Sequence, residues 1–189
     1  FSKLKKSWQD IQTVSIHGRD SIQLIKALKS NKNKIVVLTD SKIQSLELIR
    51  KNLQEFLKRG GTLLADSVCA SQSFTDAFRK EFSAALPDHI IEAIPNDDPL
   101  FSASTYGGFD LRRVTLRSPT AGEGPLSSKK RAVPPQLEGI RIGDRWAVIF
   151  SPYDISCALE KQNSMECTGY DREDAEKIAL NILLYSLNQ

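Results

Sequence analysis

Two short apolar runs on either side of one amphipathic stretch constrain the fold more than any other feature of this chain. Residues 34–39 form a continuous run rich in β-branched side chains, which is typical of a strand covered on both faces. Residues from about 44 to 59 repeat apolar side chains at intervals of three and four and predict a helix, which Gly60 and Gly61 end because glycine accepts the left-handed cap conformation. Residues 62–66 predict the next strand. This order favours parallel strands with helices on both faces.

The same patterns predict the remaining elements. The alternation of strand and helix loosens in the second half, so we expect edge strands there, some of them antiparallel. The fold class is therefore α/β, with a mainly parallel sheet and antiparallel edge additions. Helices are expected from the cap residue Asp20, across Phe74–Phe82 up to Pro87, and from the cap residue Asp171, and further strands at 13–17, 89–94, 113–117 and 145–151.

The length and the apolar content of 40% suit a single domain spanning 1–189. Residues 118–136 contain four prolines, two glycines and a basic tip, and we interpret them as a flexible surface insertion. No apolar run approaches the ~20 residues that a transmembrane helix needs. Because the chain begins at Phe1 rather than Met, we expect it to be a piece of a longer protein.

The charge distribution does not favour nucleic acid as a partner. The first 59 residues carry 13 basic and 5 acidic side chains, whereas the whole chain has a net charge of only +3. Aromatic side chains are not interleaved with these lysines and arginines, as they are in many single-strand binders. We therefore interpret the basic residues as solvated helix faces and expect no nucleic-acid binding.

Three cysteines are too few for a disulfide scaffold in a chain of this length. One bridge with one further thiol is an option, and Cys157 and Cys167 are spaced well for closing a loop. There is no Cys-x-x-Cys pair, and the two histidines are far apart in the sequence, so we expect no structural zinc site.

Polar loops follow three of the predicted strands, and they define the candidate site. If these strands are parallel, the loops share one edge of the sheet, where ligands bind in open α/β folds. We call this edge the rim. Its candidate ligand-binding residues are Asp40, Asp66, Cys69, Ser71, Ser151, Asp154, Ser156 and Cys157, with Arg79 on the following helix.

Cys69 is the candidate nucleophile. It lies between a strand and a helix amino terminus, a position that lowers a thiol pKa. The glycines that flank a nucleophile at a sharp elbow are missing, and neither His17 nor His89 is well placed as a base. A half-buried or disulfide-bonded cysteine is the alternative that we favour.

Asp66 and Asp154 are candidates for a carboxylate pair that binds a divalent cation or performs acid–base chemistry. The alternative, which we favour, is that each carboxylate caps a neighbouring loop through backbone N–H groups. Arg79 could pair with Asp66 or Glu81. The pair Gly107-Gly108 lacks the spacing of a phosphate-binding loop, so no nucleotide or other cofactor is expected.

Several segments in order resemble domain-of-unknown-function family 4159, over residues 35 to 188. The segments are Phe56–Asp66, Phe74-x-x-x-Phe78-Arg79-x-Glu81, Leu86–Asp88, Asp98–Phe101, Leu137–Ile140, Val148–Cys157, Tyr170-Asp171-x-x-Asp174-Ala175 and Asn181–Tyr185.

The resemblance implies a three-layer sandwich of the flavodoxin-like kind, similar to class I glutamine amidotransferases. It also implies that the parent proteins are bacterial and often envelope-associated or secreted, sometimes fused to a helical barrel, and it implies no established reaction. This sequence lacks the glycine-flanked cysteine and the His-x-Glu of the amidotransferases, which argues against glutaminase activity. It also has Asp98 where the family pattern suggests histidine before Pro-Leu-Phe.

Two functions follow from these observations. The first, which we favour because no catalytic constellation is complete, is a non-catalytic module of a periplasmic or envelope-associated protein that binds a small polar ligand or a partner protein domain. The second is a hydrolase or amidase that uses Cys69, or a metal ion held by Asp66 and Asp154.

Overall fold

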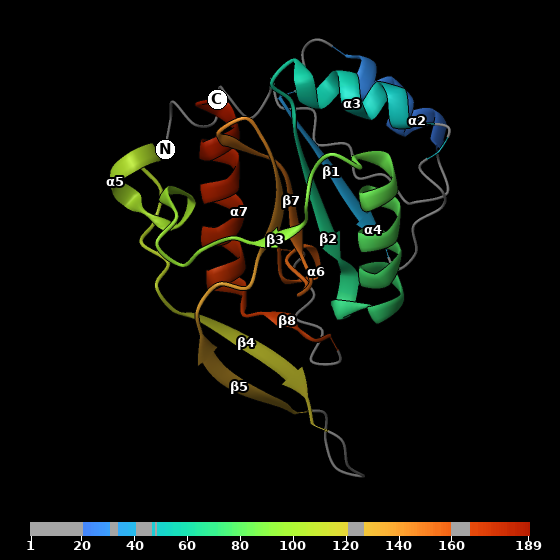
Figure 1. The fold of residues 1–189 in the computed structure, drawn as a ribbon. Coiled ribbons are helices and arrows are strands. Elements are labelled where there is room, and N and C mark those ends of the chain that lie inside the picture. The colour runs from blue at the N-terminus through green and yellow to red at the C-terminus, as the bar shows by residue number, and fades with distance from the viewer. Residues whose placement is uncertain (1–20, 31–33, 41–46, 48, 121–126, 160–166) are drawn as a thin grey trace.

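The computed structural model describes residues 21–30, 34–40, 47, 49–120, 127–159 and 167–189, and shows an α/β fold (Figure 1). Five strands form the main sheet in the order β1-β2-β7-β6-β3. Strands β1, β2 and β7 are parallel, whereas β6 is antiparallel to both β7 and β3. The bounds are Ile35–Asp40 for β1, Thr62–Ser67 for β2, Glu92–Ala93 for β3, Glu138–Ile142 for β6 and Arg145–Ser151 for β7.

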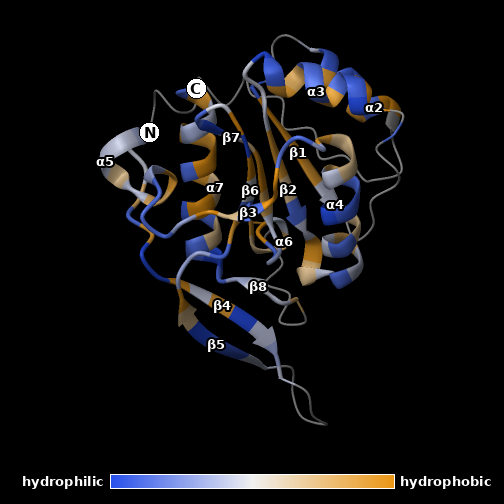
Figure 2. Cartoon of the chain, viewed as in Figure 1, coloured by the Kyte–Doolittle hydropathy of each residue, from blue (hydrophilic) through white to orange (hydrophobic). Residues whose placement is uncertain are grey.

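Helices cover both faces of the main sheet. Alternate strand residues such as Val36, Ala65 and Phe150 pack against α2, α3 and α4 on one face. Residues of the opposite parity, among them Ile149, pack against α7 on the other face. In Figure 2 the middle parts of the parallel strands are hydrophobic, as burial on both faces requires, whereas polar residues lie toward their ends. The helices are α2 (Ser21–Lys29), α3 (Arg50–Lys58), α4 (Gln72–Ala85), α5 (Ala103–Tyr106), α6 (Ser156–Leu159) and α7 (Arg172–Leu187).

The phenylalanines of α4 explain how that helix is fixed on the sheet. Phe74, Phe78 and Phe82 recur every four residues and are all buried. The ring of Phe78 stacks on the ring of Phe150 in β7, with 4.1 Å between the centroids. The helix that carries Arg79 is thereby held next to β7, and its first turn lies at the end of β2.

A second sheet of three strands extends from the body of the domain (Figure 1). Its order is β5-β4-β8, and all its pairs are antiparallel. Strand β5 belongs to the segment 118–136, which the sequence suggests is an insertion; the described part of that segment is a regular hairpin arm with β4, and residues 121–126 lie outside the described residues. The bounds are Val114–Pro119 for β4, Ser128–Val133 for β5 and Gly169–Tyr170 for β8.

The structure corrects several expected elements. The strand expected at 89–94 is only Glu92–Ala93, because just two residues pair with β6. Asp171 precedes α7 but makes no side-chain cap, and its carboxylate instead accepts from Lys130. Strands β5, β6 and β8 and the short helices α5 and α6 were not expected. The helix expected from about residue 44 begins at Arg50, and residues 47 and 49 lie in a turn before it. The expected strand at 13–17 and residues 44–46 and 48 lie outside the described residues.

Among the described residues, the structure has no helix with the length and apolar character needed to cross a bilayer.

Candidate functional site

The carboxyl ends of β1, β2 and β7 meet at one edge of the main sheet, as the sequence predicts. Asp40 in β1 lies opposite Ser67 in β2, and Asp66 lies opposite Ser151 in β7. The loops that follow β2 and β7 therefore start side by side at the same edge of the sheet. The side chain of Asp40 lies outside the described part of the chain, so the described rim consists of the last two of the three expected loops.

Asp66 ends β2 and binds the loop that follows β7. Its side chain is buried, with the residue 1% exposed. Its Oδ1 atom accepts the backbone N–H of Ile155 at 3.0 Å, and its Oδ2 atom accepts that of Ser156 at 2.9 Å. These two N–H groups belong to the start of α6, so Asp66 fixes that short helix against β2.

Asp154, which follows β7, binds the loop after β2 in return. The residue is fully buried. Its Oδ2 atom accepts the backbone N–H of Cys69, and its Oδ1 atom accepts that of Cys157 at 2.7 Å. Both rim carboxylates thus bind backbone N–H groups, which is the alternative that we favoured from the sequence.

The close approach of two buried carboxylates determines the electrostatics of the rim. Burial and, to a smaller extent, the charge of Asp154 together raise the pKa of Asp66 to about 7, against the opposing hydrogen bonds from Ser156 and Ile155. Among the residues that the structure describes, neither Asp66 nor Asp154 has an ion-pair partner. The rim therefore holds two buried carboxylates that form no ion pair among the described residues.

Cys69 is joined to Cys167 by a disulfide, so in this form it is not the nucleophilic thiolate that its position suggests. The bridge spans 98 residues of sequence and differs from the pairing of Cys157 with Cys167 that the spacing suggests. Cys69 and Ala70 both have positive φ, 54° and 53°. This turn directs the Cys69 N–H to Asp154 and brings its sulfur to Cys167.

Four residues of the rim region form a compact cluster, which we call the cysteine–aspartate cluster: Cys69, Asp154, Cys157 and Cys167. Each of them offers one atom that can bind a metal, and these four atoms lie within 4.8 Å of one another. Cys167 Sγ, for example, lies 3.8 Å from Asp154 Oδ2. Asp66 is not among these four residues.

The remaining rim residues have structural contacts. Ser71 caps α4 by accepting the N–H of Phe74, and Ser151 donates its hydroxyl to the carbonyl of Tyr153. Ser156 donates its backbone N–H to Asp66, as described above.

Arg79 pairs with neither expected partner. Its Nη2 atom lies 2.6 Å from Oε1 of Glu138 in β6, a pairing that the sequence did not suggest.

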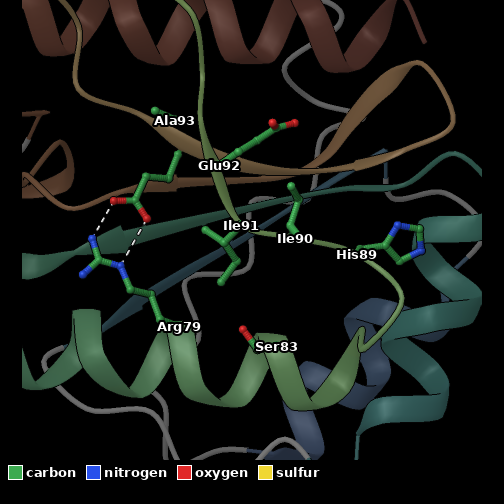
Figure 3. A pocket seen from close by; sticks show the side chains of 8 residues that line it. Arg79, Ser83, His89, Ile90, Ile91, Glu92 and Ala93 are labelled. Carbon is green, nitrogen blue, oxygen red and sulfur yellow. Dashed lines mark hydrogen bonds and ion pairs between the residues drawn. The ribbon is translucent and has the colours of Figure 1, made fainter.

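Arg79 instead lines a groove between α4 and the β3 edge of the sheet, which we call the α4–β3 groove (Figure 3). Figure 3 shows Arg79 and Ser83 rising from α4 toward the segment that carries Ile90 and Ile91. The groove has a volume of about 550 Å³. Ile90 is 73% exposed, the most exposed large apolar side chain of the described residues. The groove is lined by Arg79, Ser83, His89, Ile90, Ile91, Glu92, Ala93 and Glu138.

Comparison with known protein families shows the family to which this chain belongs. The family model for the domain of unknown function DUF4159 matches residues 38–187. The chain belongs to the DUF4159 family. No curated protein matches this DUF4159 chain in a sequence comparison. The match includes β1 from Leu38 onward, both rim loops, the groove and α7.

Two residues of the DUF4159 domain position the cluster although sequence reasoning did not single them out for it. Gly169 lies against Asp154, and a Cβ atom there would approach the Asp154 carbonyl oxygen to 2.6 Å. The backbone N–H of Tyr170 donates to the same carbonyl at 3.0 Å. The sequence feature that could have indicated this role is the position of Gly169, two residues after Cys167.

Asp98 has a structural role in this DUF4159 domain. It is 9% exposed and accepts hydrogen bonds from the Trp146 indole at 2.9 Å and from the Leu100 N–H at 2.9 Å. It also pairs with Arg141 at 3.3 Å. Asp98 therefore connects the loop before α5 to β6 and β7.

Proposed function

We propose that this DUF4159 domain is a non-catalytic binding module of a larger protein. The observation that carries the proposal is that the two rim carboxylates and the candidate nucleophile Cys69 are already engaged within the protein. Asp66 and Asp154 accept backbone N–H groups with all four carboxylate oxygens, and Cys69 is in a disulfide. A general base or a nucleophile needs a group that can reach a substrate, whereas the two carboxylates are buried and the Cys69 sulfur is bonded to Cys167.

The α4–β3 groove is the surface that best fits a ligand, and an extended peptide segment of a partner protein is the ligand that best fits the groove. Within the part of the chain that the structure describes, strand β3 ends the sheet order and pairs with β6 alone, so a partner strand can add along its other side. Ile90 and Ile91 offer apolar surface next to that edge. A strand with an apolar residue facing Ile90 would bury it, which contributes roughly 1.5–3 kcal/mol.

The finer fold relationship and the compartment belong to the same proposal. The parallel strands β1, β2 and β7 with helices on both faces support a relationship to class I glutamine amidotransferases and flavodoxin-like sandwiches. The disulfide between Cys69 and Cys167 supports a periplasmic or other envelope location, because such bonds persist in oxidising compartments.

Selection of binding peptides from a random displayed library tests the groove. We expect enriched peptides to protect the backbone amides of residues 91–93 from hydrogen exchange. Ile90→Lys should abolish binding of these peptides. Ile22→Lys on α2 is the matched control, since Ile22 is also well exposed, at 66%. Failure to enrich any peptide, or equal loss in both variants, would contradict the groove proposal.

The second candidate function is a metal-dependent hydrolase or amidase. The closeness of the four ligand atoms in the cysteine–aspartate cluster is the observation in its favour. A screen with ester, amide and phosphoester substrates in the presence of Zn²⁺ separates the two functions. Turnover that disappears in Cys157→Ser would support the hydrolase and overturn the non-catalytic proposal.

A further inference from the structure

We propose that reduction of the bond between Cys69 and Cys167 converts the cysteine–aspartate cluster into a binding site for Zn²⁺. The ligands would be the three cysteine sulfurs and one oxygen of Asp154. This inference does not depend on the α4–β3 groove, which lies elsewhere on the domain.

The spacing of the four ligand atoms in the cluster fits tetrahedral coordination of a metal ion. Zinc binds cysteine sulfur at about 2.3 Å, so two ligand atoms of a tetrahedral site lie roughly 3.8 Å apart. The four candidate atoms already lie within 4.8 Å of one another, and Cys167 Sγ is 3.8 Å from Asp154 Oδ2. Small side-chain rotations therefore suffice once the sulfurs of Cys69 and Cys167 separate.

The fold holds the ligands in place from three separate segments. Cys69 is in the short η1 helix (Val68–Ala70) after β2, Asp154 and Cys157 flank the start of α6, and Cys167 precedes β8. The N–H groups of Cys69 and Cys157 bind the Asp154 carboxylate and orient it. Each carboxylate oxygen has a second lone pair available for a metal, and such supporting hydrogen bonds are typical of metal ligands.

The charge of the rim favours a cation at this position. Asp154 is fully buried and Asp66 is 1% exposed, yet neither has an ion-pair partner among the described residues. Buried carboxylates are costly unless a positive charge compensates them. A divalent ion bound to Asp154 would supply that charge, and the exposed side of Cys69 gives it access from solvent.

The choice of zinc follows from the donor set. Thiolate ligands select zinc and other soft ions over Mg²⁺ and Ca²⁺, which prefer oxygen ligands. Three sulfurs and one oxygen complete four-coordination, which is typical of structural rather than catalytic zinc sites.

The reaction balances with a dithiol as the reductant. Opening the disulfide takes two electrons and two protons, which the dithiol supplies as it becomes a disulfide itself. Zn²⁺ then displaces one proton from each of the thiols of Cys69, Cys157 and Cys167, and the Asp154 carboxylate adds without releasing a proton. Binding therefore releases three protons for each zinc ion.

Zinc binding by the full chain in its reduced and oxidised forms tests the proposal. We expect the protein reduced with a dithiol under anaerobic conditions, and then freed of the dithiol, to bind one Zn²⁺ per chain. The oxidised protein should bind Zn²⁺ at least about tenfold more weakly, because two ligands are lost. With Co²⁺ as a spectroscopic probe, the reduced protein should show thiolate-to-cobalt charge-transfer absorption.

Two variants show whether the cluster is the site. Cys157→Ser leaves the disulfide in place but removes a ligand, so the reduced variant should lose at least about tenfold in affinity for Zn²⁺. Asp76→Asn, on the exposed side of α4, should bind as the unmodified protein does. Equal zinc affinity in the reduced and oxidised proteins, no loss in Cys157→Ser, or no binding by the reduced protein would each overturn the proposal. Should Cys157→Ser fail to fold, the comparison of the two redox forms still decides.

Discussion

Asp66 binds the loop that carries Asp154, and Asp154 binds the loop that follows Asp66. Asp66, at the end of β2, accepts N–H groups from the segment after β7, and Asp154, after β7, accepts the Cys69 N–H from the segment after β2. Both carboxylates are buried. The two loops are therefore fixed relative to each other, and their cysteines are brought together by this exchange.

Asp154→Ala should destabilise the domain strongly. The change leaves the buried N–H groups of Cys69 and Cys157 without their acceptor, which costs about 1–3 kcal/mol for each. Relief of the repulsion with Asp66 offsets part of this, so we expect the free energy of unfolding in urea to fall by about 2–4 kcal/mol. Asp76→Ala on exposed α4 is the control and should change it by less than about 0.5 kcal/mol. A loss equal to the control would show that the two N–H groups find other acceptors.

Asp66 should make the domain less stable as the pH rises from about 4 to about 7. The pKa of its carboxyl is about 7 in the folded protein and 3.8 as its ordinary value. Between these values the folded state binds a proton that the unfolded chain has lost, so the free energy of unfolding falls with increasing pH. Asp66→Asn should flatten this part of the curve in urea unfolding at a series of pH values. Parallel curves for the two proteins would refute the assignment to Asp66.

Reduction of the Cys69–Cys167 bond in the presence of a metal chelator should lower stability. The bond closes a loop with a sequence separation of 98, and a loop of that length typically contributes about 2–4 kcal/mol, mainly by restricting the unfolded chain. Thermal unfolding with and without a dithiol measures the loss. Cys157→Ser keeps the bond and should show the same dependence on the dithiol. If excess Zn²⁺ restores part of the stability of the reduced protein, the gain reports binding to the folded state.

Gly169→Ala should perturb the cluster through backbone contact. Its new Cβ atom would lie 2.6 Å from the carbonyl oxygen of Asp154, which cannot move without shifting the loop after β7. We expect a loss of about 1–3 kcal/mol in the free energy of unfolding. Gly143→Ala is the control, because that site has open space but a φ of +62°, and there the cost is about 1 kcal/mol from conformation alone. Only Gly169→Ala should also weaken zinc binding by the reduced protein.

The position of the rim could be predicted from the sequence because local patterns determine it. The apolar run at 34–39, the helix ended by Gly60 and the run at 62–66 specify parallel strands, and the structure confirms that the ends of β1, β2 and β7 align. The capping role of Asp66 and Asp154 was also predicted, since aspartate after a strand commonly binds nearby N–H groups.

The partners at the rim could not be predicted, because they depend on contacts between distant segments. Cys69 and Cys167 meet only because the chain returns through β8 beside the loop after β7, and sequence spacing favoured Cys157 instead. Arg79 pairs with Glu138 for the same reason, since β6 was not recognised as a strand. Metal-ligand motifs read from short spacings miss a cluster assembled from three segments.

The hairpin of β4 and β5 lies within the covalent ring that Cys69 and Cys167 close. A protease that cuts the connection between these two strands therefore produces two pieces that stay tethered by the sulfur bond. Such a nicked molecule would migrate as an intact chain on a denaturing gel run without thiols and would separate into two bands only when a thiol is added.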